Sequence, residues 1–144
     1  MNRLSWEDCI HQKIVVEQGK DLERSQSLLN ISKLRFAFWK NTQAPDFLKV
    51  EGYYEVIKEL LLSLIYQKGL NCLNHICLIA FLEEFYPNLN FEANKINQLR
   101  IFRNDVNYRG KFMDENYLKN NEVQINAIIV KLLSISESNI KEEN

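Results

Sequence analysis

The sequence is poor in the residues that interrupt helices. It has 4 glycines and 2 prolines among 144 residues, and so few turn signals favour a few long helices over many short strands. No apolar run reaches the roughly 18 residues that would cross a bilayer. Residues 1–8 carry acids where a signal peptide has its apolar region. We therefore expect a cytoplasmic protein without a membrane segment.

Motifs for cofactors and metals are also absent. The chain has no glycine-rich phosphate loop and no nucleophile elbow. The set Cys72, His75 and Cys77, and the pair Cys9 and His11, lack the ligand spacing of structural zinc sites. An odd number of cysteines without a C-x-x-C pair suits reduced thiols, with Cys72 and Cys77 as core residues and His75 as a structural histidine. We predict no metal and no cofactor.

Apolar residues recur at helical spacing along most of the chain. The pattern predicts a short helix over 5–16 and further helices over about 21–40, 47–68, 73–85, 90–109 and 115–136. Short connections make sequential helices antiparallel neighbours. The prediction is one all-α domain over 1–144, an up-and-down bundle of four long helices plus a short N-terminal helix. Residues 137–144 are expected to be a frayed acidic tail.

One predicted helix carries more polar chemistry than packing requires. Arg100, Arg103, Asn104 and Asn107 are spaced i, i+3, i+4 and i+7, which places them on one face. Five cations and one acid lie within residues 95–111, whereas the whole chain carries a net charge of -1. The positive charge of the protein is concentrated here.

This face has two interpretations. In the first, Arg100, Arg103 and Arg109 complement the negative end of a helix dipole, and Asn104 and Asn107 make hydrogen bonds between helices. In the second, the arginines recognise phosphate, since a guanidinium matches two phosphate oxygens and neighbouring amides can fix a ribose or base edge. The residue pattern alone leaves both open.

The motif in this helix resembles that of a known family. Residues 103–108, RNDVNY, resemble the R-N-x-x-x-H signature of HEPN domains, which are all-helical proteins. Further landmarks of the same resemblance follow the family's order along the chain: residues 25–29, 54–61, 68–69, 74–75, 99–104 and 108–110.

The resemblance implies a helical bundle that forms a homodimer through the motif-bearing helices, so that two motifs face one cleft. In active members this cleft is a metal-independent ribonuclease, in which histidine helps remove the 2′-hydroxyl proton and arginine stabilises the phosphorane. Many members are toxins encoded beside a small nucleotidyltransferase that neutralises them, and others only bind RNA or nucleotides.

The chain departs from the motif at its histidine position, which is Tyr108. A phenol has a pKa of about 10, so roughly one tyrosine in a thousand is ionised at pH 7 and Tyr108 is a poor base. On a regular helix Arg103 and Tyr108 also lie about 140° apart. They converge only if the helix end distorts or if two copies cross the dimer. Gly110 stands where members modified by the transferase carry tyrosine, so that regulation is not expected.

Three hypotheses follow. The first is a HEPN-type RNA- or nucleotide-binding homodimer of a toxin–antitoxin-like module with a nucleotidyltransferase partner, whose nuclease activity is weak or absent. The second is an active metal-independent endoribonuclease in which Tyr108 or another group replaces the histidine. The third is a purely structural dimerisation protein. The predicted catalytic pair is Arg103 and Tyr108, and the predicted RNA or nucleotide contacts are Arg100, Arg103, Asn104, Asn107, Tyr108 and Arg109.

Overall fold

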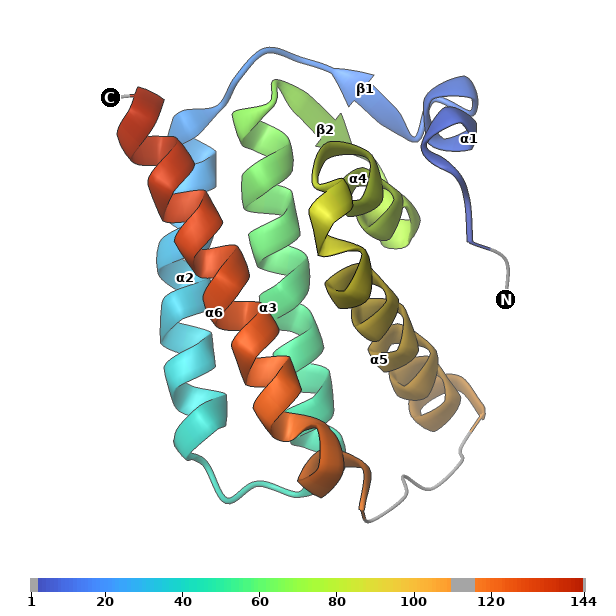
Figure 1. The fold of residues 1–144 in the computed structure, drawn as a ribbon, viewed down its shortest axis with the longest axis vertical. Helices are drawn as coiled ribbons and strands as arrows, with labels where there is room; N and C mark the ends of the chain where they lie inside the picture. Colours follow the sequence, from blue (N-terminus) through green and yellow to red (C-terminus); the bar gives the residue numbers. More distant parts are fainter. Residues whose placement is uncertain (1–2, 110–115, 144) are drawn as a thin grey trace.

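The structure, a computed structural model, describes residues 3–109 and 116–143, without the side chains of 107–109. It is largely helical, in agreement with the all-α prediction apart from two short strands (Figure 1). In chain order the elements are α1 (Trp6–His11), β1 (Val15–Glu17), α2 (Leu22–Asn41), α3 (Asp46–Gln67), β2 (Leu70–Cys72), the 3-10 turn η1 (His75–Cys77), α4 (Leu78–Phe85), the 3-10 turn η2 (Pro87–Leu89), α5 (Asn90–Arg109) and α6 (Tyr117–Glu143).

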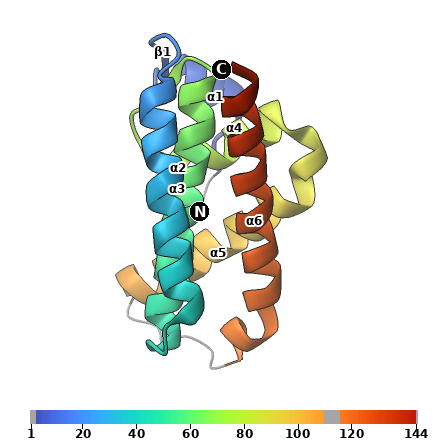
Figure 2. The ribbon, with the colours of Figure 1, turned by 90° about the vertical axis from the view of Figure 1, so that its left-hand side faces the viewer.

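The long helices are packed around α3. This helix contacts α2, α5 and α6, and it contributes many of the fully buried side chains, among them Tyr53, Leu60 and Leu64. The four long helices alternate in direction, and α2, α3 and α6 follow the long axis of the molecule (Figures 1 and 2). Figure 2 shows α5 crossing them more obliquely. Because α5 packs on α3, the orientation of α5 about its own axis determines whether Arg100 and Arg103 point toward α3 or away from it.

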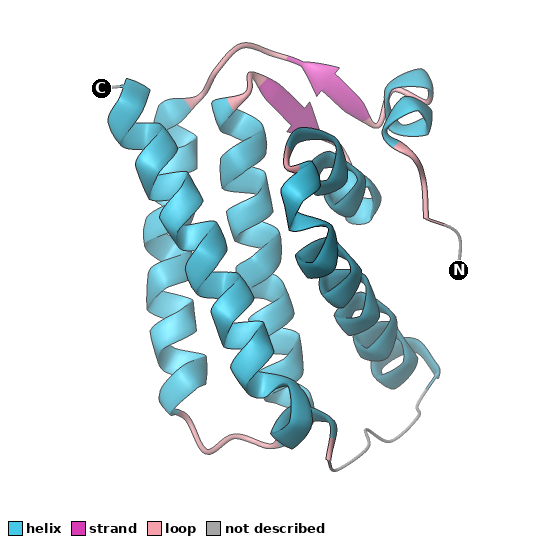
Figure 3. Cartoon of the chain, viewed as in Figure 1, coloured by secondary structure: helices cyan, strands magenta, loops and turns pink. Residues whose placement is uncertain are grey.

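A small two-stranded sheet lies at one end of the helices (Figure 3). In the antiparallel pairing of β1 with β2, Val15 lies opposite Cys72 and Glu17 opposite Leu70. Gly69 turns the chain out of α3 with a φ of 77°, a conformation that glycine adopts without strain. The short helix predicted from residue 5 is present as α1 but ends at His11 and not at residue 16, and residues 15–17 form a strand for which the all-α prediction had no place. Strands of three residues are too short to show a period-2 pattern.

Two predicted helix boundaries needed correction. The helix expected from residue 73 begins as α4 at Leu78, after η1. The expected frayed tail is the end of α6, which is helical through Glu143. Ser136 and Ile140 are buried there, and Lys20 forms an ion pair of 2.8 Å with Glu143. The tail is ordered because its apolar face packs on the other helices.

Buried polar side chains join α2, α3 and α6. Ser25, Ser63, Gln67 and Ser136, which we call the serine–glutamine network, are each at most 5% exposed. The hydroxyl of Ser63 lies 2.8 Å from those of Ser25 and Ser136. Gln67 Nε2 donates to both outer serine hydroxyls at 3.0 Å, and its Oε1 accepts from Asn139 at 2.9 Å. Small side chains with satisfied hydrogen bonds let three helices approach one another at low cost.

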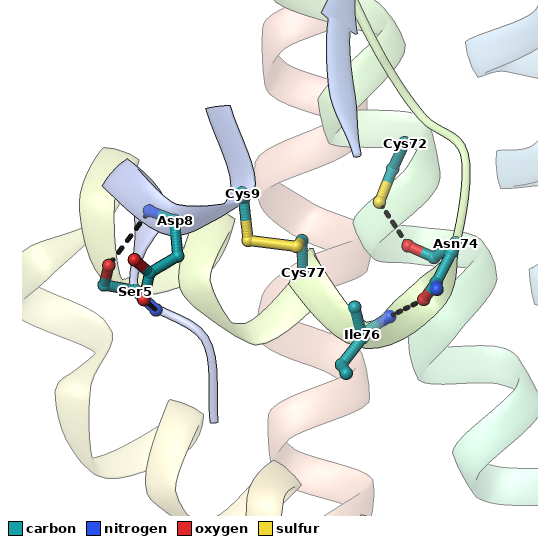
Figure 4. Close-up of a disulfide and its surroundings, with 7 residues drawn as sticks. All are labelled: Ser5, Asp8, Cys9, Cys72, Asn74, Ile76 and Cys77. Atoms are coloured by element: carbon teal, nitrogen blue, oxygen red, sulfur yellow. Dashed lines mark hydrogen bonds between the residues drawn. A yellow bond between two sulfur atoms is a disulfide. The ribbon is translucent and has the colours of Figure 1, made fainter. Parts of the chain in front are cut away.

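A disulfide ties the N-terminal segment to the start of α4 (Figure 4). Cys9 of α1 is bonded to Cys77 of η1 across 68 residues of chain, and Cys72 remains a buried free thiol beside them. The expectation of three reduced cysteines, with Cys77 an ordinary core residue, was therefore wrong. Disulfides are rare in the reducing cytosol of mesophiles, so the cysteines no longer support a cytoplasmic location.

Within residues 3–109 and 116–143, every helix is too short or too polar to cross a bilayer.

Candidate functional site

The described arginines of the predicted face are half-buried and held by neighbouring side chains. Arg100 Nε and NH2 donate to Asn97 Oδ1 on the same helix at 3.1 and 2.9 Å. Arg103 points toward α3, where its NH2 lies 3.3 Å from Glu51 Oε1 and 3.8 Å from Glu55 Oε1. Asn104 Oδ1 accepts a long hydrogen bond of 3.5 Å from Arg103. Arg103 is thus anchored by acids of α3, which neither interpretation of the sequence included.

Arg103 belongs to a cluster of charges around one aromatic ring. The guanidinium carbon lies 5.4 Å from the centre of the Tyr54 ring, and Lys58 Nζ lies 5.6 Å from the same centre. Lys58 also pairs with Glu55 at 2.9 Å. We call Glu51, Tyr54, Glu55, Lys58 and Arg103 the Tyr54 cluster. Its α3 members are spaced i, i+3, i+4 and i+7, so the sequence does contain the signal that places them on one face.

The Tyr54 cluster is partly open to solvent. The side chains of Glu51 and Glu55 are 37% and 35% exposed, whereas that of Arg103 is 17% exposed. Burial raises the pKa of Tyr54, and the nearby charges of Arg100 and Arg103 oppose that rise. The Nε of Arg103 is buried and has no hydrogen-bond partner in the described part of the chain. This N–H is closed off from solvent, so any ligand would have to meet the terminal NH1 and NH2 groups of the guanidinium.

The 3-10 turn η1 lies beside the same face of α5. Ile76 of η1 lines a shallow hollow together with Asn97 and Arg100. His75 is exposed as a residue, but partial loss of water around its ring, together with the charges of Lys58 and Arg103, lowers its pKa, which Glu55 opposes. Sequence reasoning treated His75 as structural. The charges of Lys58, Glu55 and Arg103 act on His75 only because the chain runs through β2 and η1 after α3.

The rest of the predicted site lies outside the described residues. The backbone of α5 extends through Arg109, but the side chains of Asn107, Tyr108 and Arg109 are not described, and neither is Gly110. Their roles stay predictions. Among the side chains that are described, no three His, Cys, Asp or Glu residues are grouped as metal ligands.

Comparison with known proteins adds no identification: no family model, no curated protein and no solved structure matches this chain.

Proposed function

We propose that this chain is an RNA- or nucleotide-binding protein of the HEPN type. The proposal joins the sequence resemblance and the net positive charge of residues 95–111 to one structural observation. That observation is the half-buried Arg103 guanidinium beside Lys58, over the ring of Tyr54. Two adjacent cations on a rigid helical support suit a phosphate group.

The ion pairs of Arg103 are compatible with this role. A guanidinium has five N–H donors, and the hydrogen bonds to Asn104 and Glu51 each use one hydrogen of the terminal NH1 and NH2 groups, which leaves one on each. The two acids fix the orientation of the side chain, so that less conformational entropy is lost when phosphate binds. Lys58 likewise uses one ammonium hydrogen for Glu55 and keeps two.

A titration of fluorescent single-stranded RNA tests the proposal. Log Kd should rise linearly with log salt, because bound cations release counterions from the RNA. Arg103→Ala should weaken binding roughly tenfold and lower the salt slope by about 0.7. Arg35→Ala is the matched control, since Arg35 of α2 also pairs with a glutamate, at 3.4 Å. A purely structural protein would show no RNA binding at 50 mM salt.

The proposal includes a homodimer and a partner. The resemblance pairs two copies through the motif-bearing helix, which is α5, and Ile101 on that helix is 38% exposed. A small nucleotidyltransferase of a toxin–antitoxin-like module would complete the unit. Light scattering should give twice the monomer mass of 17.1 kDa, and a clean monomer at tens of micromolar would contradict the shared cleft.

A metal-independent endoribonuclease is the second candidate. The sequence resemblance favours it, but Tyr108 argues against it, because a phenol is a poor base.

A further inference from the structure

We propose that the outer face of α2 is a docking surface for an acidic amphipathic helix of a partner protein. The name α2 outer face is used here for Ser27, Ile31, Leu34, Phe38 and Asn41. The inference goes beyond RNA binding and does not depend on it, because the Tyr54 cluster lies on α3 and α5.

Three large apolar side chains form a row on the α2 outer face. Ile31, Leu34 and Phe38 are 41%, 74% and 60% exposed. Together with the two polar members they follow the alternating spacing of four and three residues that is typical of a helix packed along a second helix. Single exposed apolar side chains are common on soluble proteins, but a row of them along one helix marks a contact surface.

The other side of α2 is occupied by the bundle. Leu29, Ser32 and Phe36 are buried there, and α2 packs on α3 and α6 (Figures 1 and 2). Since the inner and outer faces lie on opposite sides of the helix, burial in the bundle does not explain the apolar residues of the α2 outer face. Contact with a further helix does.

The charges of α2 favour an acidic partner. The helix carries four cations and one acid, so 4 minus 1 gives +3, whereas the whole chain carries -1. At about 100° per residue, Arg24 and Arg35 flank the apolar row on one side, and Lys33 and Lys40 flank it on the other. Acidic side chains on both edges of an apolar stripe would meet these cations.

Intramolecular ion pairs leave this positive charge accessible. Lys33 lies 3.2 Å from Glu137 of α6, and Arg35 lies 3.4 Å from Glu59 of α3. The two cationic side chains are 45% and 55% exposed. Ion pairs this exposed are weak, and each cation has further N–H donors for a second carboxylate.

The charges also decide between the possible occupants. Arg24 and Lys40 lie over aromatic rings, 4.6 and 5.5 Å from the ring centres, which do not neutralise them. Two α2 helices packed face to face would bring like charges together, which disfavours a second copy of this chain. A membrane surface requires a broad apolar face, whereas this row is as narrow as a coiled-coil contact. An amphipathic helix with flanking acids fits both the width and the charge.

Fluorescence anisotropy of a labelled synthetic peptide tests this surface on the full chain. The probe is a helical peptide of about five turns, with leucines at alternating spacings of three and four residues and glutamates on both sides of them. The comparison peptide has lysine in place of each glutamate. We expect the glutamate peptide to bind about tenfold more tightly than the lysine peptide, and its binding should weaken as salt rises.

Replacing Leu34 and Phe38 together by serine should weaken binding of the glutamate peptide about tenfold or more, because central apolar side chains carry most of the energy of such contacts. The thermal midpoint should not change, since both side chains are exposed. Leu73→Ser is the matched control. Leu73 is 66% exposed and belongs to the segment between β2 and η1, so this variant should bind the peptide like the wild type.

Each alternative result overturns the inference. Equal binding of the two peptides would remove the role of charge. Absence of binding, or equal binding by the wild type and the double variant, would mean that the α2 outer face is not the docking surface. The homodimer proposed through α5 should persist in the double variant, and a fall to the monomer mass would show that a second copy occupies this face. Flotation of the wild type alone with phosphatidylserine vesicles would assign the face to a membrane. Absence of RNA binding would contradict only the proposed function.

Discussion

Polar side chains lie between helices in two regions of this molecule, and the two are built differently. The serine–glutamine network joins α2, α3 and α6, and Ser25, Ser63 and Ser136 are fully buried within it. The Tyr54 cluster joins α3 to α5, contains two cations and two acids, and leaves its carboxylates about one third exposed. The first region is uncharged and buried, and the second is charged and partly exposed to solvent.

The difference separates structure from binding. In the network, the donors of Gln67 meet acceptors at 3.0 Å, so nothing is left for a ligand, and removal of any member takes one hydrogen-bond partner away from other buried polar groups. In the cluster, the ion pairs are partly solvated and contribute little to stability, and the carboxylates of Glu51 and Glu55 are about one third exposed. Mutations should therefore damage folding in the first region and ligand binding in the second.

The largest effect should come from the disulfide, which joins α1 to η1. Replacing Cys9 and Cys77 together by alanine should lower the free energy of unfolding by about 3–5 kcal/mol, because the bond closes a loop of 68 residues in the unfolded chain. Urea denaturation measures the loss. Hydrogen exchange should show α1 and η1 less protected and the amides around Ser63 unchanged. If a reductant leaves the wild-type midpoint where it was, the bond does not contribute.

Gln67→Leu should break the closed network at its centre. The change leaves the hydroxyls of Ser25 and Ser136 and the amide of Asn139 short of partners, and we expect a loss of about 2–3 kcal/mol. Gln124→Leu, at an exposed position of α6, controls for the added apolar surface. RNA affinity should not change. A loss comparable to that of the control would mean that the network is dispensable.

Gln67 also illustrates what the sequence predicted and what it did not. The helices over 21–40 and 47–68 were placed to within a residue, because their apolar stripes are long and Asp21 is a recognisable cap that accepts from Arg24 N at 3.0 Å. Serine and glutamine within those helices resemble solvent-facing positions. Their burial depends on which helix packs opposite, and local periodicity carries no information about that.

The same limit applies to the candidate site. The face with Arg100, Arg103 and Asn104 was visible as a helical pattern, but its acidic partners on α3 depend on how α5 crosses that helix. The pairing of Cys9 with Cys77 needs two distant segments to meet. His75 lies on η1 next to Cys77, so its position also depends on where this disulfide-linked turn packs. Spacing rules find groups on one element, whereas the Tyr54 cluster is shared by α3 and α5.

Glu122 of α6 offers an intermediate case, a carboxylate with two donors that is 31% exposed. Burial raises its pKa, but the hydrogen bonds from Tyr53 at 2.6 Å and Lys49 at 2.9 Å outweigh it and leave the pKa lowered. A carboxylate whose pKa is lower in the folded than in the unfolded state stabilises the folded state at any pH above its unfolded pKa. This stabilisation is lost as the pH falls through the folded-state pKa.

Acid titration of stability measures this effect. Wild-type stability should fall as pH drops below about 4.5, and Glu122→Gln should remove part of that fall. Glu137→Gln, whose exposed carboxylate pairs with Lys33 at 3.2 Å, should leave the acid profile unchanged. Identical acid profiles for Glu122→Gln and the wild type would show that the Tyr53 and Lys49 hydrogen bonds do not distinguish the folded from the unfolded state.

The smallest expected effect comes from replacing one acceptor side chain in the Tyr54 cluster. It separates the two regions clearly, because loss of an acceptor is harmful in the serine–glutamine network and is expected to improve RNA binding in the cluster. Removing an acceptor from the serine–glutamine network lowers the free energy of unfolding and leaves RNA affinity unchanged. In the Tyr54 cluster, Glu55 accepts from Lys58 at 2.9 Å and draws Arg103 to 3.8 Å, so Glu55→Gln frees two cations for phosphate. We expect RNA affinity to rise about three- to fivefold, with a change in unfolding free energy below about 0.5 kcal/mol. Glu23→Gln on α2 is exposed, makes the same change in net charge and should raise affinity far less. Weaker RNA binding in Glu55→Gln would mean that the acid positions the cations more than it competes for them.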